Sequence, residues 1–149
     1  MMKFETKTTK KVSKKKLTHH VYYLVDSSGS MAPFRKEVVT LLNNQINDLK
    51  KIKTNTNTFV NIATFGNNDA FDLLCEHLPI SKLTNIDKDS YNPTGMTPLN
   101  DCLITALYED TLEDTYLIVL ITDGCDTSSF IKTNAISKLI KDKIATDRW

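Results

Sequence analysis

Residues 21–30 read Val-Tyr-Tyr-Leu-Val-Asp-Ser-Ser-Gly-Ser, an apolar run followed at once by an acid and a loop of small polar residues. An apolar run of this length that ends in a Ser/Gly turn is typical of a short buried strand. Alternate residues of an extended strand end point the same way. Asp26, Ser28 and Ser30 can therefore aim three oxygen-bearing side chains at one point, and Gly29 lets the backbone bend around it.

Expected strands and helices alternate along the rest of the chain. The expected strands cover residues 20–25, 58–65, 70–78 and 116–122, and the expected helices cover 38–52, 99–108 and 131–144. Pro33 suits a first helical turn, turn residues join the second and third strands into a hairpin, and Ser128 or Ser129 can cap the last helix. This order predicts a three-layer α/β/α sandwich with a mostly parallel central sheet.

A second acid, Asp123, follows the very apolar run at 116–122. A strand this hydrophobic on both faces is expected inside a sheet that helices cover. Ligands of such sheets bind beyond the carboxyl ends of the strands, so Asp26 and Asp123 mark a candidate site. Oxygen ligands suit Mg²⁺ best, and Mn²⁺ or Ca²⁺ also fit. The alternative for the Ser-rich turn is an ordinary helix N-cap.

Three motifs in this order resemble the von Willebrand factor type A (vWA) domain and its metal-ion-dependent adhesion site (MIDAS). They are Asp26-x-Ser28-x-Ser30, Gly95-Met96-Thr97-Pro98-Leu99 and Thr122-Asp123-Gly124, and the resemblance spans roughly residues 20–149. The loop at 91–101 is similar to that of bacterial and phage members.

The resemblance implies a role for each motif residue. Ser28 and Ser30 would bind the ion through their hydroxyls, Thr97 would bind it directly or through water, and Asp26 and Asp123 would touch the ion or hold its waters. Gly29 and Gly124 flank these ligands. Asp101 would cap a helix start or brace the site from behind the ligands.

Two carboxylates against a 2+ ion give a nearly neutral site that can accept one more carboxylate. The family leaves its sixth position for an acidic group of a partner. The expected function is therefore a divalent-metal-dependent protein-binding module within a larger assembly, not an enzyme, with a protein carboxylate as its ligand.

One alternative is a Mg²⁺-dependent hydrolase. An aspartate after the first strand resembles the nucleophile of haloacid-dehalogenase phosphatases, but Ser28 stands where those enzymes place their general acid. The sequence also lacks a Gly-x-Ser-x-Gly elbow and a Walker loop.

The charge distribution raises a second alternative. Residues 1–16 contain seven lysines and one acid. The remaining residues carry 12 of the 19 basic and 17 of the 18 acidic side chains, so their net charge is −5. We divide the chain into a basic tail, 1–17, and a vWA-like domain, 18–149. The tail is expected to be a solvated extension, an arm of a nucleic-acid-associated adaptor, or a cover for a sheet edge.

Several classes of protein are excluded by what the sequence lacks. No apolar run approaches the roughly 18–20 residues of a membrane span, and Met1–Lys16 lacks the apolar middle of a secretion signal. Cys75, Cys102 and Cys125 are widely spaced and form no Cys-x-x-Cys pair. A reducing, cytoplasmic setting is expected, and the three histidines are expected to pack or lie at the surface.

The chain of 149 residues is short for the family, whose domains continue with further strands and a closing helix. In the family's strand order, residues 116–122 would then form an open edge. We expect a truncated domain, a partner or second copy that completes the sheet, or a tail that covers the edge.

Overall fold

The computed structural model describes residues 17–52, 57–66, 69–108 and 114–149. The strands are β1 (Thr18–Asp26), β2 (Asn57–Gly66), β3 (Asp69–Pro79) and β4 (Thr115–Ile121), and the helices are α1 (Arg35–Lys51), α2 (Leu99–Tyr108) and α3 (Thr133–Ile144). Three short 3-10 turns complete the described elements: η1 (Gly29–Phe34), η2 (Ile80–Lys82) and η3 (Lys88–Ser90). All seven predicted strands and helices are present.

The four strands form one sheet in the order β3-β2-β1-β4. β1 runs parallel to both of its neighbours, with Tyr23 opposite Ile62 of β2 and Val119 of β4. β3 runs antiparallel to β2, so the predicted hairpin pairing is confirmed. Its turn residues, 67 and 68, lie outside the described residues.

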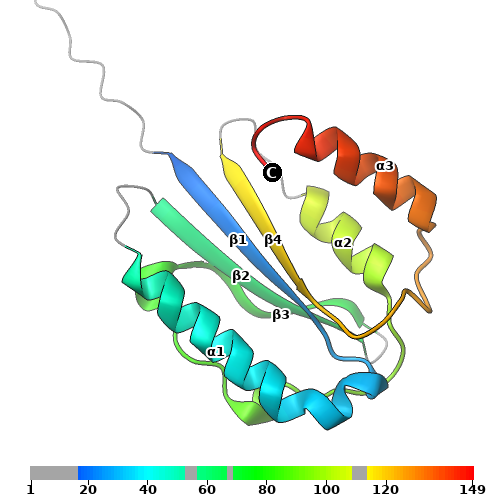
Figure 1. Ribbon diagram of the computed structural model, residues 1–149, viewed down its shortest axis with the longest axis horizontal. Coiled ribbons are helices and arrows are strands. Elements are labelled where there is room, and N and C mark those ends of the chain that lie inside the picture. Colours follow the sequence, from blue (N-terminus) through cyan, green and yellow to red (C-terminus); the bar gives the residue numbers. More distant parts are fainter. Residues whose placement is uncertain (1–16, 53–56, 67–68, 109–113) are drawn as a thin grey trace, which may run out of the picture.

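Helices cover both faces of the sheet, with α1 on one side and α2 and α3 on the other (Figure 1). The alternating side chains of β1 explain this arrangement. Val21, Tyr23 and Val25 pack into the core beneath α1. Tyr22 and Leu24 point the opposite way, into the core that contains Cys102 and Ala106 of α2. The three-layer α/β/α sandwich predicted from the sequence is therefore confirmed.

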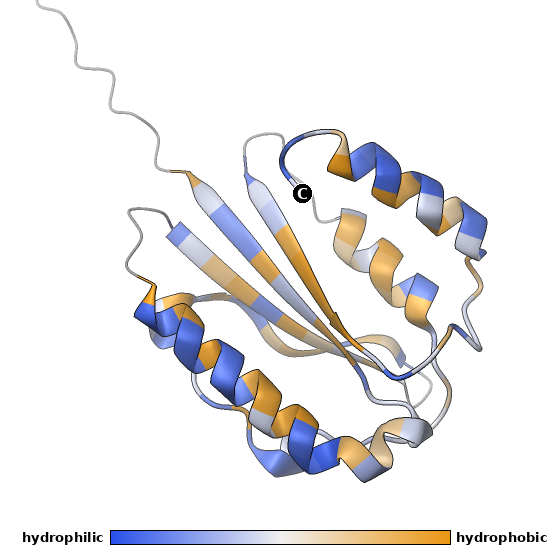
Figure 2. Ribbon diagram, viewed as in Figure 1, coloured by the Kyte–Doolittle hydropathy of each residue, from blue (hydrophilic) through white to orange (hydrophobic). Residues whose placement is uncertain are grey.

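Among the described residues β4 lies at the edge of the sheet, as the sequence predicted, and its two faces pack into the cores on either side of the sheet. Figure 2 shows hydrophobic residues along most of this strand. Leu117 is nevertheless 54% exposed, whereas Tyr116 is buried. No strand of the described residues pairs with the outer edge of β4, although Tyr116 N–H donates to the carbonyl oxygen of Arg148 at 2.6 Å.

Two predicted helix starts differ from the structure. Pro33 lies in η1, and α1 begins after it at Arg35. α3 begins at Thr133, with Lys132 at its N-cap, because Ser129 is engaged elsewhere: its hydroxyl accepts from the backbone N–H of Asp101 at 3.0 Å. In the described part of the chain, no helix is long and apolar enough to cross a membrane.

Candidate metal centre

The predicted ligands lie in three loops at the carboxyl end of the sheet. Asp26 is the last residue of β1, and Ser28 and Ser30 follow it. Asp123 follows β4, which is the parallel neighbour of β1, so the two acids leave the same edge of the sheet. Thr97 lies two residues before α2.

A chain of hydrogen bonds joins four of these five residues. Asp26 Oδ1 accepts from the backbone N–H of Ser28 at 2.8 Å. The hydroxyl oxygens of Ser28 and Ser30 lie 3.1 Å apart, and the Ser30 hydroxyl donates to Asp123 Oδ1 at 3.0 Å. The chain runs from the buried Asp26 and Ser28 to the exposed Ser30 and Asp123, so one end faces solvent.

Asp26 is fully buried without a positively charged partner. Its Oδ2 accepts from the Thr122 hydroxyl at 2.7 Å. No Lys, Arg or His among the described residues forms an ion pair with it. A buried carboxylate with two hydrogen bonds and no counterion is costly, and a cation beside it would offset that cost.

Thr97 is tied to the same loops through its backbone. Its N–H donates to the Thr127 hydroxyl at 2.9 Å, and its carbonyl oxygen accepts from the Thr127 N–H at 2.9 Å. Two further backbone bonds join the first and second loops: Gly29 N–H to the Gly95 oxygen at 3.0 Å, and Thr94 N–H to the Ser27 oxygen at 2.6 Å. The Thr97 side chain is buried.

The glycines differ in what they contribute. Gly29 does not use the left-handed backbone region, so its contribution is its N–H rather than an unusual bend. Gly124 donates its N–H to the Thr122 hydroxyl at 3.2 Å. The close approach occurs instead at Gly66, where a Cβ atom would lie 2.6 Å from the carbonyl carbon of Ser27.

Asp101 contacts the loop after β4 rather than the predicted ligands. Its Oδ2 accepts from the Phe130 N–H at 2.9 Å, and its Oδ1 accepts from the Ile131 N–H at 3.0 Å. Asp101 therefore holds the segment 130–131 in place, and its predicted role behind the metal ligands stays a prediction.

Two neighbours of Asp26 were missed by sequence reasoning. The Tyr91 hydroxyl donates to the backbone oxygen of Asp26 at 2.5 Å. Burial, and then the negative charges of Asp26 and Asp123, raise the pKa of Tyr91, which keeps it protonated as a donor. Thr122, the other neighbour, precedes Asp123 in the third motif, but its spacing did not reveal the bond to Asp26.

The donor set fits a hard divalent cation. Ser28, Ser30, Thr97, Asp26 and Asp123 offer only hydroxyl and carboxylate oxygens. No group of three or more His, Cys, Asp or Glu side chains placed to share a metal occurs among the described residues, and the candidate centre itself contains two acids, with hydroxyls as its other donors. Burial raises the pKa of the Cys75 and Cys102 thiols, which favours the predicted inert packing role of both.

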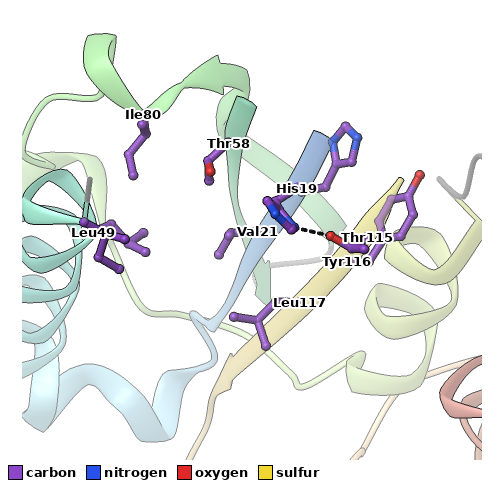
Figure 3. A pocket seen from close by; sticks show the side chains of 10 residues that line it. His19, Val21, Leu49, Thr58, Ile80, Thr115, Tyr116 and Leu117 are labelled. Atoms are coloured by element: carbon purple, nitrogen blue, oxygen red, sulfur yellow. Dashed lines mark hydrogen bonds between the residues drawn. The ribbon is translucent and has the colours of Figure 1, made fainter. Parts of the chain in front are cut away.

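A separate hollow of about 310 Å³ lies at the opposite end of the sheet (Figure 3). His19 points toward Thr115 there, and Val21, Leu49 and Leu117 line the wall. The buried His20 pairs with Asp114 at 3.0 Å. None of the predicted metal ligands lines this hollow, so it is distinct from the candidate centre.

Comparisons with known proteins match the fold. No family model and no curated protein matches the sequence. Among solved structures, proximal thread matrix protein 1 (PTMP1) from the mussel byssus aligns over 86% of this chain, with a TM-score of 0.63 and 16% identity. The pilus adhesin SpaC from Lactobacillus rhamnosus GG aligns over 76%, with a TM-score of 0.59 and 18% identity. The fold is vWA-like.

A further PTMP1 structure has a zinc-occupied MIDAS motif; it aligns over 86% of this chain with a TM-score of 0.59 and 16% identity. The vWA-like chain spans 34% of the PTMP1 chain and 16% of SpaC. Because these neighbours come from a mussel and a bacterium, they do not support the narrower prediction of a bacterial or phage-like member.

Proposed function

We propose that this vWA-like chain is a divalent-metal-dependent protein-binding module. The observation that carries the proposal is the hydrogen-bonded run from the buried, uncompensated Asp26 through Ser28 and Ser30 to the exposed Asp123. The zinc-occupied MIDAS motif of a structural neighbour supports a metal at the equivalent place.

Five residues would hold the ion: Asp26, Ser28, Ser30, Thr97 and Asp123. When bound, the ion would supply an open coordination position for an oxygen ligand. Two carboxylates balance its 2+ charge, so a third carboxylate adds one negative charge only and can be accepted. The exposed Ser30 and Asp123 leave this side open to a partner's Asp or Glu side chain.

Mg²⁺ is our first choice of metal because every donor is a hard oxygen. Mn²⁺ and Ca²⁺ share this preference, and Zn²⁺ is included because a neighbour binds it. We also propose that the chain binds a protein partner, works in a cytoplasmic setting and forms part of a larger assembly. The nucleic-acid role rests on residues 1–16, which lie outside the described residues.

A hydrolase is the weaker candidate. A nucleophilic Asp26 would need an approachable carboxylate oxygen, yet this side chain is fully buried and both oxygens accept hydrogen bonds. Ser28 also supplies no carboxyl proton donor at the position two residues on. We therefore propose binding without turnover. Phosphatase activity of the native chain with Mg²⁺ that is absent from Asp26→Asn would contradict this proposal.

The proposal is tested by titrating the metal-free chain with Mg²⁺, Mn²⁺, Ca²⁺ and Zn²⁺ in a calorimeter, followed by an acetylated Gly-Asp-Gly peptide. We expect one or more of the metals to bind with one-to-one stoichiometry and the peptide to bind only afterwards. Ser28→Ala and Asp123→Ala should lose both events, whereas the matched Ser137→Ala on the exposed face of α3 should keep them. Metal binding that survives both site variants would place the ion elsewhere.

A further inference from the structure

A largely apolar hollow lies along the loop that carries the predicted ligand Thr97. It measures about 200 Å³ and is lined by Ala70, Met96, Pro98, Asp101, Ser128 and Phe130. Met96 and Pro98 flank the predicted ligand Thr97, so consecutive residues serve the metal centre and the hollow. A partner segment that continues beyond an acid bound at the ion can therefore reach residues that line this hollow.

Phe130 forms one wall of the hollow with 97% of its surface exposed. A large aromatic side chain that is this exposed adds almost no buried apolar area, so it does not stabilise the folded domain by burial. Met96, on the facing loop, is 57% exposed. Two large apolar side chains are thus exposed around one hollow, which is typical of a binding surface.

The Phe130 loop is held in place by α2. Both carboxylate oxygens of Asp101 are used on the N–H groups of Phe130 and Ile131. Asn100, the preceding residue, donates its side-chain N–H to the Ile131 oxygen at 3.0 Å, and its backbone N–H donates to Asp126 Oδ1 at 3.2 Å. A wall that is already ordered costs a ligand little entropy on binding.

The charges of the hollow suit an apolar occupant. Its described lining residues include no Lys or Arg, and the one acid among them, Asp101, has both oxygens satisfied by backbone N–H groups. An acidic side chain would find no cation in the hollow itself, whereas an apolar side chain would contact Met96, Pro98 and Phe130. The acid of a partner therefore belongs at the ion and its apolar neighbour in the hollow.

We infer that the partner segment carries an acidic residue with a large apolar residue one or two positions away. This inference rests on the proposed function, since the ion must first capture the acid. It adds to that function a basis for choosing among acidic partners. The acid supplies metal-dependent binding, and the apolar side chain in the Met96–Phe130 hollow determines which acidic segments bind tightly.

Three acetylated peptides test the inference against the metal-loaded chain: Gly-Asp-Gly-Gly, Gly-Asp-Leu-Gly and Gly-Asp-Gly-Leu. Affinity is followed by NMR with ¹³C-labelled methionine methyl groups, and Met96→Leu assigns the Met96 signal. We expect at least one leucine peptide to bind about five-fold tighter than the glycine peptide, as partial burial of one Leu side chain predicts, and to shift the Met96 methyl signal.

Phe130→Ala should remove this gain and leave the affinity of Gly-Asp-Gly-Gly unchanged. Tyr108→Ala is the matched control, because Tyr108 is another highly exposed aromatic, at the far end of α2. If the peptides bind with metal but leucine gives no gain, or the gain survives Phe130→Ala, the inference is wrong and the proposed function stands. If no acidic peptide binds with any of the four metals, both fail.

Discussion

The carboxyl end of the sheet and the outer edge of β4 present opposite chemistry on one small domain. At the carboxyl end, hydroxyls, carboxylates and backbone groups from three loops hydrogen-bond to one another. Along the edge, an uncharged strand exposes Leu117 and Leu120, and the described residues supply no further strand. Polar groups are exposed at the first region and apolar groups at the second, so the two should respond differently to metal, charge and concentration.

Removal of the Asp26 charge should have the largest effect, and only at the carboxyl end. We expect Asp26→Asn to weaken metal binding by about 100-fold, because the buried charge that attracts the ion is lost. A metal at 100 times its dissociation constant should stabilise the native chain by about 2.7 kcal/mol, and at the same concentration this gain should fall to about 0.4 kcal/mol in the variant. Thermal unfolding with metal and with chelator measures both.

In chelator, Asp26→Asn should change stability little, since it removes an uncompensated buried charge and the Thr122 hydroxyl can turn to accept from the new amide. Asp142→Asn, at an exposed position of α3, is the control and should leave the metal response intact. A variant that keeps the full gain in stability from metal would show that Asp26 is not part of the centre.

The β4 edge should respond to charge instead. We expect the native chain to self-associate through this edge, and Leu117→Lys to weaken that association by about ten-fold because an added charge blocks strand pairing. Sedimentation over a range of concentrations measures the effect. Leu41→Lys, at an exposed position of α1, is the control. A native chain that stays monomeric at every concentration would contradict this expectation.

Tyr91→Phe should have a smaller effect at the carboxyl end. It removes the donor to the Asp26 backbone oxygen and leaves that buried oxygen without this partner. The expected loss is about 1 kcal/mol in the free energy of unfolding, measured by urea denaturation with chelator present. If Tyr91→Phe also weakens metal binding, the hydrogen bond to the Asp26 backbone positions Asp26 for the ion.

Asp101→Asn should give the smallest effect. An amide offers one acceptor atom where the carboxylate offers two, so one of the N–H groups at 130–131 loses its partner. The leucine peptides are expected to bind more tightly than Gly-Asp-Gly-Gly, and we expect this difference in affinity to fall about two- to three-fold. The affinity for metal should not change. A change in metal affinity would instead assign Asp101 to the metal centre.

Most of the fold could be predicted because its signals are local. The continuous apolar run Val21, Tyr22, Tyr23 and Leu24 predicts a strand with two buried faces, and both faces are packed in the structure. Ser129 shows where local signals fail. It looks like a helix cap in the sequence, but its hydroxyl bonds to α2, and Lys132 stands at the cap of α3.

The candidate site divides in the same way. Asp26, Ser28 and Ser30 are close in sequence, so a local pattern predicts that their oxygens converge, although β1 ends at Asp26 and Ser30 lies in η1 rather than in an extended strand end. The partners that hold them are distant: Tyr91 is 65 residues from Asp26, and Thr122 is 96 residues away. Their spacing carries no periodic signal, so only the packed structure reveals them.

The order of strands and helices, the two packed faces of β1 and the candidate oxygen donors at the carboxyl end of the sheet could be read from the amino-acid sequence. These follow from side-chain type and from periods of a few residues. The contact of Asp101 with the Phe130 loop, the bonds of Tyr91 and Thr122 to Asp26, and the hollow lined by the neighbours of Thr97 appear only in the packed structure. Such contacts depend on how the loops close over one another, and closure between distant residues leaves no local pattern to read.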